Sequence, residues 1–575
     1  MQQAFAPTPM HNSEIAKYLA EIADMMELCG ENFFQVRAYR NGSRAVHDYP
    51  GNFAKLTIQQ MEKVPGIGKG ISSKIDTLIR TGELPIHAEL RKKVPPALID
   101  VMRLPGLGPK RVKQLHDELG VGSVDDLKNA LEAGALRSIR GFGPKMQDHL
   151  RHALEHRTAV TTRRWIYANA AIEVDSLLSY MRACHNVARA EIAGSFRRRR
   201  DTVGDLDLLA ISSDPAAVMK RLVEYPRIAH SGGAGDSKTS VILHDGLQVD
   251  LRVLSEESYG AAMVYFTGSK DHCVHIRRIA QRMGLSLNEY GLFRGSESIA
   301  ARTEEDVYRA LGLDWIPPEL REDRGEIEAA MEHRLPHLIV REDLRGDLHS
   351  HSTHTDGRAS IEEMAHAADR AGLEYLAVTD HSQRLAMVNG LTPERLREQW
   401  REIEDVRSRV KVKLLRGIEV DIMEDGSLDL PDEILAELDW VVASVHYKLS
   451  QPHDELTRRL VRAIQNPNVD VIGHPTGRIL IDKREPSRFD FEEVARAAAG
   501  EGCALEVNSQ ASRLDLIDTN CMTAKQAGVK LVISSDSHSP KGFGLLQLGI
   551  NQARRGWIEP GDVLNTRALK DLRQR

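Results

Sequence analysis

The stretch DLHSHSTHTDG at residues 347–357 concentrates side chains that bind metals. It holds Asp347, His349, His351, His354 and Asp356. Imidazoles and carboxylates are ligands for borderline and hard divalent cations, so one edge of a metal site is a natural interpretation. A solvated loop of small polar residues would have the same composition. The stretch alone does not decide between the two.

Apolar runs elsewhere in the C-terminal part favour the metal site. They recur at intervals of roughly 30 residues, the period of a strand plus a helix. The runs read GDLHSHS, YLAVTDHS, LLRGIEVDI, WVVASVHY, VDVIGHPTG, CALEVNSQ and KLVISSDSHS, and nearly all end in potential ligands. Helical stretches such as SIEEMAHAADRAG separate them. Because the C-terminal ends of parallel strands meet at one face of a barrel, we predict a distorted (βα)7 barrel whose strand ends form a metal cluster.

A second set of carboxylates lies in residues 191–210 (EIAGSFRRRRDTVGDLDLLA) and 241–254 (VILHDGLQVDLRVL). Alternation along a strand sends Asp205 and Asp207 to one face, and a second alternating strand offers Asp250. Carboxylates crowded on one face repel each other unless cations lie between them. The pattern therefore indicates two Mg²⁺ or Mn²⁺ ions that clamp an in-line phosphoryl transfer, and the bland alternative is solvated strand aspartates.

Residues upstream of these aspartates could hold the phosphates of a nucleotide. Gly194 and Ser195 can turn backbone and hydroxyl donors toward a triphosphate, and Arg198 can supply charge. The alternative interpretation of RRRR is a solvated loop.

The first 165 residues repeat one device three times: VPGIGKGISSKI at 64–75, LPGLGPKRVKQL at 104–115 and IRGFGPKMQDHL at 139–150. Paired glycines allow a tight turn, and the next helix presents unpaired N–H groups to a phosphate. This helix-hairpin-helix pattern grips a nucleic-acid backbone without reading sequence, whereas single copies would be ordinary glycine turns. The expected DNA contacts are Gly66, Gly68, Lys69, Gly106, Gly108, Lys110, Arg111, Gly141, Gly143 and Lys145.

Length and composition limit the number of domains and the kinds of partner that the chain can have. A chain of 575 residues is too long for one core, so we expect several domains. With 28% charged residues and a net charge of -6, any nucleic-acid surface must be local. The 5 cysteines show neither a CxxC pair nor a disulfide framework, which fits a reducing cytoplasm. Neither a secretory leader nor a membrane-spanning run is evident, so we expect no membrane partner.

From AGSFRRRR through GDLD, VDLR and YFTGSK to LNEYGLF, the chain resembles DNA polymerase beta, a family X polymerase. The resemblance implies an α+β nucleotidyltransferase palm in which Asp205, Asp207 and Asp250 hold the metals. It implies nucleotide-binding roles for Gly194, Ser195, Arg198, Gly204, Tyr265, Phe266, Gly268 and Ser269. Arg277 and Glu289 match positions that support the closed site. Lys270 and Cys273 depart from the family's aspartate and asparagine, which leaves base contacts and fidelity open.

The N-terminal part resembles the lyase domain of the same family. The alignment of PGIGKGISSKIDTL places Lys74 at the position of the Schiff-base lysine. Tyr39 and Arg40 match the family, whereas Phe34, Gln35 and Gly70 replace phosphate-binding residues. DNA-end binding is therefore a firmer expectation than lyase chemistry.

The C-terminal part resembles the polymerase and histidinol phosphatase (PHP) superfamily, with the pattern HxH, xDH, E, H, HP and DxH. The resemblance implies up to three metal ions. The first would take His349, His351, Glu419 and Asp536; the second Glu419, His446 and His474; the third Asp356, His381 and His538. His354, Asp380 and Glu506 are left as supporting or loop residues. Ligands of this kind suit Mn²⁺, Zn²⁺ or Fe, and clustered cations suit phosphoester hydrolysis.

The order of domains is that of bacterial family X DNA polymerases. The expected boundaries are 1–93 lyase-like helix-hairpin-helix, 94–165 helical DNA-binding, 166–258 palm, 259–324 nucleotide-selecting, 325–344 linker and 345–575 PHP barrel. The expected function is gap-filling repair synthesis on gapped or primed DNA from deoxynucleoside triphosphates, with a 3′-5′ exonuclease or phosphoesterase, in a monomer. The alternatives are a DNA-end-binding scaffold with lapsed catalysis and a phosphatase with a DNA-binding appendage.

Overall fold

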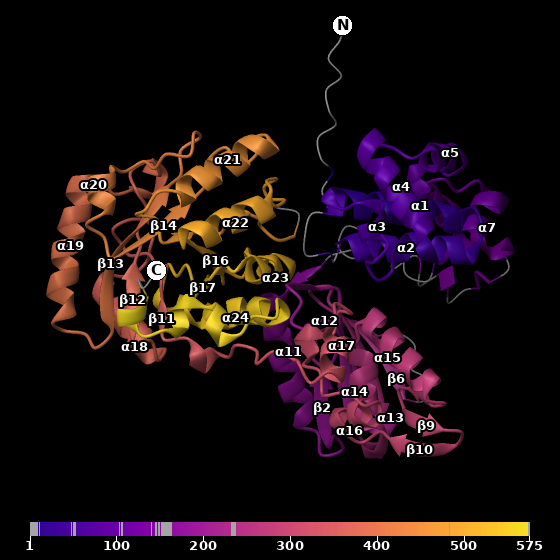
Figure 1. Cartoon of the computed structure of the whole chain (residues 1–575). Coiled ribbons are helices and arrows are strands. Elements are labelled where there is room, and N and C mark those ends of the chain that lie inside the picture. The colour runs from indigo at the N-terminus through magenta and orange to yellow at the C-terminus, as the bar shows by residue number, and fades with distance from the viewer. Residues whose placement is uncertain are drawn as a thin grey trace, which may run out of the picture. The chain divides into compact units, whose positions relative to one another are not determined.

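A computed structural model of the chain forms two compact units, residues 1–163 and 164–575 (Figure 1). It describes residues 10, 12–47, 49, 53–102, 104, 107–139, 141–143, 146, 147, 150, 154, 164–231, 237–481 and 484–572.

The first unit is built of helices over its described residues. They are α1 (Asn12–Leu28), α2 (Phe33–His47), α3 (Ile58–Met61), α4 (Lys69–Thr81), α5 (Pro85–Lys93), α6 (Pro96–Met102), α7 (Pro109–Leu119) and α8 (Val124–Glu132). Ile15, Leu19 and Ile22 recur at helical spacing on α1 and are fully buried. Gly82 and Gly120 adopt positive φ and end α4 and α7, as glycine does at helix C-termini.

The second unit begins with a mixed sheet in the order β2-β4-β7-β6-β5. Its strands are β2 (Arg189–Ile192), β4 (Asp205–Ile211), β5 (Ile228–Ser231), β6 (Lys238–Leu243) and β7 (Gln248–Leu254). Strands β4 and β7 are parallel neighbours. Leu206 and Leu208 pack beneath helices α11 (Tyr167–Arg182) and α13 (Pro215–Val223). The opposite face of β4 carries the aspartates.

A smaller subdomain follows the sheet. It contains α14 (Tyr259–Thr267), α15 (Lys270–Arg282), α16 (Glu304–Ala310) and an antiparallel sheet of β8 (Ser286–Asn288), β9 (Gly291–Arg294) and β10 (Glu297–Ala300). Residues 325–344, expected as a linker, include α17 (Glu326–Met331). Ile327 and Ala330 of α17 join the same core as Ile276 and Val307. This segment is therefore packed onto the subdomain that precedes it.

The C-terminal part is a seven-stranded parallel sheet whose strand order follows the sequence, which confirms the predicted barrel. The strands are β11 (Gly346–Asp347), β12 (Tyr375–Val378), β13 (Lys413–Asp421), β14 (Trp440–Ser444), β15 (Val471–Ile472), β16 (Ala504–Asn508) and β17 (Leu531–Ser534). Around them lie α18 (Ile361–Arg370), α19 (Pro393–Arg407), α20 (Asp432–Leu435), α21 (His453–Ile464), α22 (Phe491–Glu501), α23 (Asp518–Ala527) and α24 (Leu546–Arg555) (Figure 1). Each predicted apolar run supplies one strand.

The first and last strands meet just beyond their C-terminal ends. Ser350 forms a parallel bridge with Ser537, and the N–H of His351 donates to the carbonyl of Ser537 over 2.9 Å. The barrel therefore closes at the segments that carry the predicted ligands.

The interior of the barrel changes character along its axis. Leu415, Trp440 and Val442 lie in an apolar inner cluster. Positions farther along the same face are polar, as at Glu419 and Asp421, because side chains alternate along a strand. The lower layer of the barrel interior is therefore apolar, and the layer nearer the C-terminal ends of the strands is polar.

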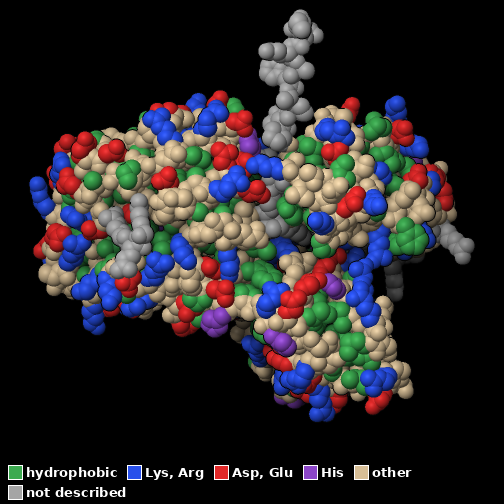
Figure 2. All heavy atoms as spheres, viewed as in Figure 1, with side chains coloured by type: hydrophobic (Ala, Val, Ile, Leu, Met, Phe, Trp, Pro, Cys, Tyr) green, Lys and Arg blue, Asp and Glu red, His purple; other side chains and the backbone are tan. Residues whose placement is uncertain are grey.

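Among the described helices, none combines the length and the apolar character that crossing a bilayer requires. On the face drawn in Figure 2, Lys and Arg side chains are interspersed with Asp and Glu.

Candidate active sites

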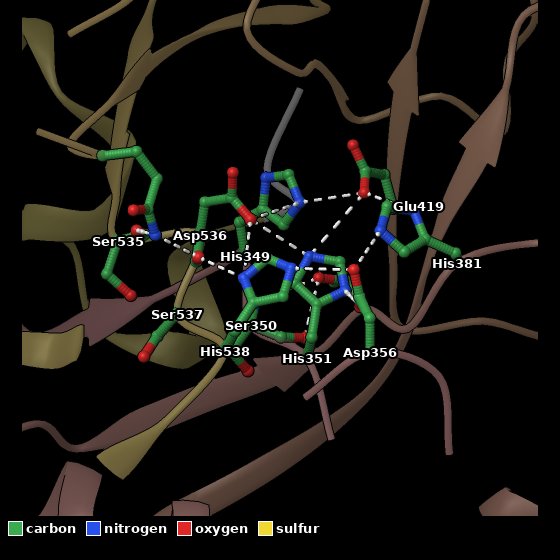
Figure 3. A network of polar contacts seen from close by, with 12 residues as sticks. His349, Ser350, His351, Asp356, His381, Glu419, Ser535, Asp536, Ser537 and His538 are labelled. Carbon is green, nitrogen blue, oxygen red and sulfur yellow. Dashed lines mark hydrogen bonds and ion pairs between the residues drawn. The ribbon is translucent and has the colours of Figure 1, made fainter. Parts of the chain in front are cut away.

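Nine predicted ligands converge at the C-terminal mouth of the barrel (Figure 3 shows most of them). Glu419 lies in β13, and the others follow their strands: His349 and His351 after β11, Asp356 in the loop beyond, His381 after β12, His446 after β14, His474 after β15, and Asp536 and His538 after β17. Side chains spread over much of the sequence thus become neighbours.

Glu419 is the centre of this cluster. Its carboxylate oxygens lie 2.8 Å from His381 Nδ1, 3.0 Å from His474 Nε2, 3.3 Å from His446 Nε2, 3.4 Å from His349 Nε2 and 3.7 Å from His351 Nε2. One carboxylate in contact with so many imidazoles is the geometry of a bridging ligand.

Three groups of side chains could each hold a cation: His349, His351 and Asp536; His351, Asp356, His381 and His538; and His381, Glu419 and His446. They resemble the expected sets, with differences. His351 and His381 are each shared between two groups. His474 lies outside the third group, although its Nε2 is 3.0 Å from Glu419. The rings stack closely, as between His351 and His538, whose centroids are 4.2 Å apart.

The charges of the cluster fit divalent cations. Burial lowers the pKa of His351 to about 4, helped by His538 and His381, so this ring is in the neutral form that binds metals. Both of its ring nitrogens are buried without a hydrogen bond to the described residues. For Glu419, burial raises the pKa, but His381 and His349 outweigh it and hold the pKa well below the usual value. The neutral His351 ring and the ionised Glu419 carboxylate are the kinds of donor that such a site uses.

Other buried side chains orient the ligands. His349 Nδ1 lies 2.7 Å from Glu506 Oε1, which leaves Nε2 facing the cluster. His446 Nδ1 lies 3.2 Å from Asp421 Oδ1. Asp380 accepts hydrogen bonds from the N–H of Ser352 and from Thr355, and so fixes the loop that carries Asp356. Asp421 was missed from sequence, although the alternation in EVD puts it on the face of Glu419.

The polar residues of the stretch 347–357 therefore have different roles. His349, His351 and Asp356 belong to the cluster. His354 instead faces Glu402, with 2.8 Å between His354 Nε2 and Glu402 Oε2. Asp347 is buried, accepts from Ser535, and has its pKa raised to about 6 by burial.

The three palm aspartates share one face of the mixed sheet. Asp207 on β4 is the register partner of Asp250 on β7, and Asp205 lies two residues before it. Burial, followed by the charges of Asp205 and Asp250, raises the pKa of Asp207 to about 7. Gly194 adopts φ of +62°, and a Cβ there would overlap the Asp207 carboxylate. Such crowding of like charges suits cations held between the carboxylates.

The predicted nucleotide-binding residues surround this face. Gly194 and Ser195 begin the short helix α12 (Gly194–Arg197), and Gly204 directly precedes β4. Arg198 donates from Nη1 to the carbonyl of Thr267 over 2.5 Å and from Nε to Glu322 over 3.1 Å.

The YFTGS segment ends α14. Tyr265 and Phe266 pack edge to face with centroids 4.9 Å apart, and Gly268 and Ser269 form the turn into α15. The Arg277 guanidinium lies 5.0 Å from the centre of the Tyr265 ring.

The two departures from the family lie beside this turn. Cys273 is buried and donates to the carbonyl of Tyr265, whereas Lys270 is exposed.

The glycine repeats share one local geometry. In each, the residue between the glycines is buried: Ile67, Leu107 and Phe142. In each, the carbonyl of the second glycine accepts from two N–H groups of the next turn. Gly66 and Gly141 have positive φ. Lys69, Lys110 and Arg111 are exposed at the starts of α4 and α7, while Gly106 and Lys145 lie outside the described residues. Exposed helix N-termini with adjacent basic side chains suit phosphate binding.

Lys74 is half-buried on α4, and its Nζ lies 4.6 Å from the centre of the Tyr39 ring. Phe34, one of the three positions expected to depart from the family's phosphate-binding residues, is 76% exposed. The contact of Lys74 with Tyr39 does not by itself identify a nucleophile.

Comparisons with known proteins agree with this layout. Family models match a helix-hairpin-helix domain at residues 10–84, a SAM-like helix-hairpin-helix tandem at 98–151, a DNA polymerase beta thumb at 262–322 and a PHP domain at 347–510. A probable phosphatase of Thermoanaerobacter sp. (strain X514) is 33% identical over 38% of this chain and 89% of its own length. A probable phosphatase of Aliivibrio fischeri (strain MJ11) is 32% identical over 34% of this chain and 79% of its own.

One relative matches from end to end. The DNA polymerase/3'-5' exonuclease PolX of Bacillus subtilis (strain 168) is 39% identical over 98% of this chain and 99% of its own length. Together with the helix-hairpin-helix, thumb and PHP matches, this shows that the chain belongs to the bacterial family X DNA polymerases that carry a C-terminal PHP domain.

Proposed function

We propose that this protein fills gaps in DNA by template-directed synthesis and trims 3′ ends by hydrolysis. One observation carries the proposal: a single chain holds two separate ligand centres, the aspartates of β4 and β7 and the histidine-rich mouth of the barrel. The first suits nucleotidyl transfer, and the second suits phosphoester hydrolysis.

For synthesis, we assign Asp205, Asp207 and Asp250 to two Mg²⁺ or Mn²⁺ ions. When bound, such ions neutralise the triphosphate and activate the primer 3′ oxygen. Gly194, Ser195 and Arg198 would bind the triphosphate of a deoxynucleotide. The segment from Tyr265 to Ser269 would lie against its sugar and base.

For hydrolysis, we assign up to three Mn²⁺ or Zn²⁺ ions to the nine barrel ligands. When bound, these ions would supply charge neutralisation of the phosphoester and a water of lowered pKa. Glu506, Asp421 and Asp380 hold the ligands in orientation. The phosphatase names of the barrel's relatives make removal of a terminal phosphate a second candidate reaction.

For DNA binding, we assign the exposed hairpin residues of the first unit to phosphates of gapped or primed DNA, with Lys74 as a candidate lyase nucleophile. The domain boundaries given above, a monomeric state and action in the cytoplasm complete the proposal.

The test is a primer assay on DNA with a single-nucleotide gap, run with Mg²⁺ and Mn²⁺ separately. With deoxynucleotides the primer should grow by one nucleotide, and without them it should shorten from its 3′ end. A 3′-phosphorylated primer in a parallel reaction distinguishes phosphatase from exonuclease. If neither growth nor shortening occurs with either metal, the chain acts as a DNA-end-binding scaffold instead.

A further inference from the structure

A short loop, residues 318–324, links the nucleotide-binding turn to the PHP barrel. On one side, the carbonyl of Arg321 accepts from the N–H of Ser269 over 2.9 Å. On the same side, Glu322 Oε1 accepts from Arg198 Nε over 3.1 Å. The loop therefore touches both the turn after α14 and the arginine assigned to the triphosphate.

The other side of the loop meets helix α24 of the barrel through Arg555. Its Nη1 donates to Glu322 Oε1 over 2.9 Å and to the carbonyl of Arg198 over 2.7 Å. Its Nη2 donates to Asp518 on α23 over 2.5 Å. The barrel thus contacts Arg198 twice, once through its backbone and once through the carboxylate that holds its side chain.

This contact is buried and charged. The Arg555 side chain is 2% exposed, and that of Glu322 is 8% exposed. Burial raises the pKa of Glu322, but Arg555, Arg198 and Arg200 outweigh it and hold the pKa well below its usual value. Glu322 is therefore an anion shared by cations from both domains. Loss of Arg555 would remove one of the cations around Glu322 and the donor to the Arg198 carbonyl, so we expect Glu322 and Arg198 to rearrange.

We propose that Arg555 is a positioning residue for the polymerase: from within the PHP domain, it fixes Glu322 and the Arg198 backbone, and so orients the Arg198 guanidinium for the incoming triphosphate. This inference rests on the proposed role of Arg198. It makes the affinity for deoxynucleotides depend on the nuclease domain, independently of the barrel's metal ligands.

The neighbouring arginine provides a matched control. Arg554 also leaves α24 toward the first part of the unit, where its Nε donates to Glu319 over 2.9 Å and its Nη1 to the carbonyl of Ile339 over 3.0 Å. It contacts neither Arg198 nor Glu322 among the described residues. Glu319 belongs to the same loop, so Arg554→Met removes the same kind of side chain and another barrel contact to the loop, but it spares Glu322 and Arg198, on which the proposed linkage depends.

The experiment measures KM for the deoxynucleotide, kcat and 3′-end hydrolysis on gapped DNA with the full-length protein. Arg555→Met should raise KM about 10-fold or more, change kcat less than about 3-fold, and leave hydrolysis at the wild-type rate. Arg555→Lys should recover part of the KM effect, because lysine restores the charge without the planar fork. Arg554→Met should leave KM within about 2-fold of wild type.

Arg198→Ala separates the possible failures. If Arg198→Ala leaves KM unchanged, the proposed triphosphate role is wrong. If Arg198→Ala raises KM while neither Arg555 variant does, the role stands and Arg555 is not a positioning residue. If Arg555→Met acts through Arg198, it should add little to KM in an Arg198→Ala background, whereas additive effects would overturn the linkage. Equal losses of synthesis and hydrolysis in both Arg555 variants would also overturn it, because they would indicate a general structural role.

Discussion

At the scale of single residues, a small number of carboxylates in the barrel site each lie close to several histidine rings. The Glu419 carboxylate lies close to five histidine rings. Asp536 lies close to His351, and Asp356 lies close to His538. Removing a shared imidazole such as His351 therefore takes a donor from two possible cation positions at once.

Replacing His349 and His351 together by Ala should abolish 3′-end hydrolysis, by at least about 10²-fold, while gap filling continues. Bound metal per protein, measured by elemental analysis, should fall in parallel, and far-UV circular dichroism should show a preserved fold. The control is His354→Ala in the same stretch, which faces Glu402 and should hydrolyse normally. A folded double mutant with wild-type hydrolysis would mean that the nuclease lies elsewhere.

At the scale of elements, the repeated glycine turns place helix N-termini and basic side chains at the surface of the first unit. Contacts of this kind read phosphates and not bases, so their contribution depends on salt and is indifferent to sequence.

Lys110→Ala with Arg111→Ala should weaken binding to gapped DNA alike for all sequences. The slope of log K against log salt should become shallower by roughly 2, about one for each phosphate that is no longer neutralised. Fluorescence anisotropy titrations at several salt concentrations measure both quantities. Lys128→Ala on α8 of the same unit, outside the glycine repeats, is the control and should keep the wild-type slope. A sequence-selective loss would contradict phosphate binding.

A buried ion network fixes α16 against the palm. Glu304 Oε1 accepts from Arg197 and from Arg321, each over 2.7 Å. Burial raises the pKa of Glu304, but Arg321 and Arg197 outweigh it and hold the pKa well below its usual value of 4.5. A carboxyl whose pKa is depressed by folding stabilises the native state above pH 4.5, and this contribution is lost as the pH falls below that value.

Glu304→Gln should therefore lower the free energy of unfolding at pH 7 by about 3 kcal/mol, because it leaves the buried Arg321 and the half-buried Arg197 without their anion. The difference from wild type should shrink as the pH falls from about 5 to 3, where the wild-type carboxyl is losing its advantage. Urea unfolding across this pH range gives the comparison. A difference that stays constant with pH would show that the charge of Glu304 is not what stabilises α16.

At the scale of the whole molecule, synthesis and hydrolysis use different side chains on different sheets. The aspartates lie on a mixed sheet, and the histidines lie at the mouth of a parallel barrel. The two chemistries should therefore be separable by single substitutions, even though a buried contact through Arg555 joins the domains.

Asp250→Ala should abolish nucleotide addition, by at least about 10²-fold, and leave primer shortening intact. Both are followed in one gel assay on gapped DNA, with and without deoxynucleotides. The neighbouring Gln248→Ala, which removes a donor to Asp250 but no carboxylate, should lose far less. Near-normal extension by Asp250→Ala would remove the aspartates from the polymerase site.

Much of this architecture is readable from sequence because its signals are periodic. The alternation in GDLDLL and QVDLRV predicted a shared carboxylate face, and the recurring strand ends predicted the barrel. The sequence could not predict that His351 and His381 are each shared between two ligand groups, because the orientation of the histidine rings depends on partners such as Glu506 and Asp421. The contact between Arg555 and Glu322 joins residues 233 positions apart and follows no sequence period, so no local sequence pattern predicts it.

The closure of the barrel at Ser350 and Ser537 joins two segments that the ribosome synthesises at different times. Asp347 and Ser535, which hydrogen-bond beside that seam, are 188 positions apart. At ribosomal speeds of about 5–20 residues per second, roughly 10–40 seconds separate their synthesis. Asp536 and His538 are synthesised after the palm, which precedes the barrel in the sequence. The palm carboxylates are therefore synthesised before the last ligands of the barrel, and a chain that stopped before β17 would lack Asp536 and His538 and also Arg555, which is proposed to position Arg198.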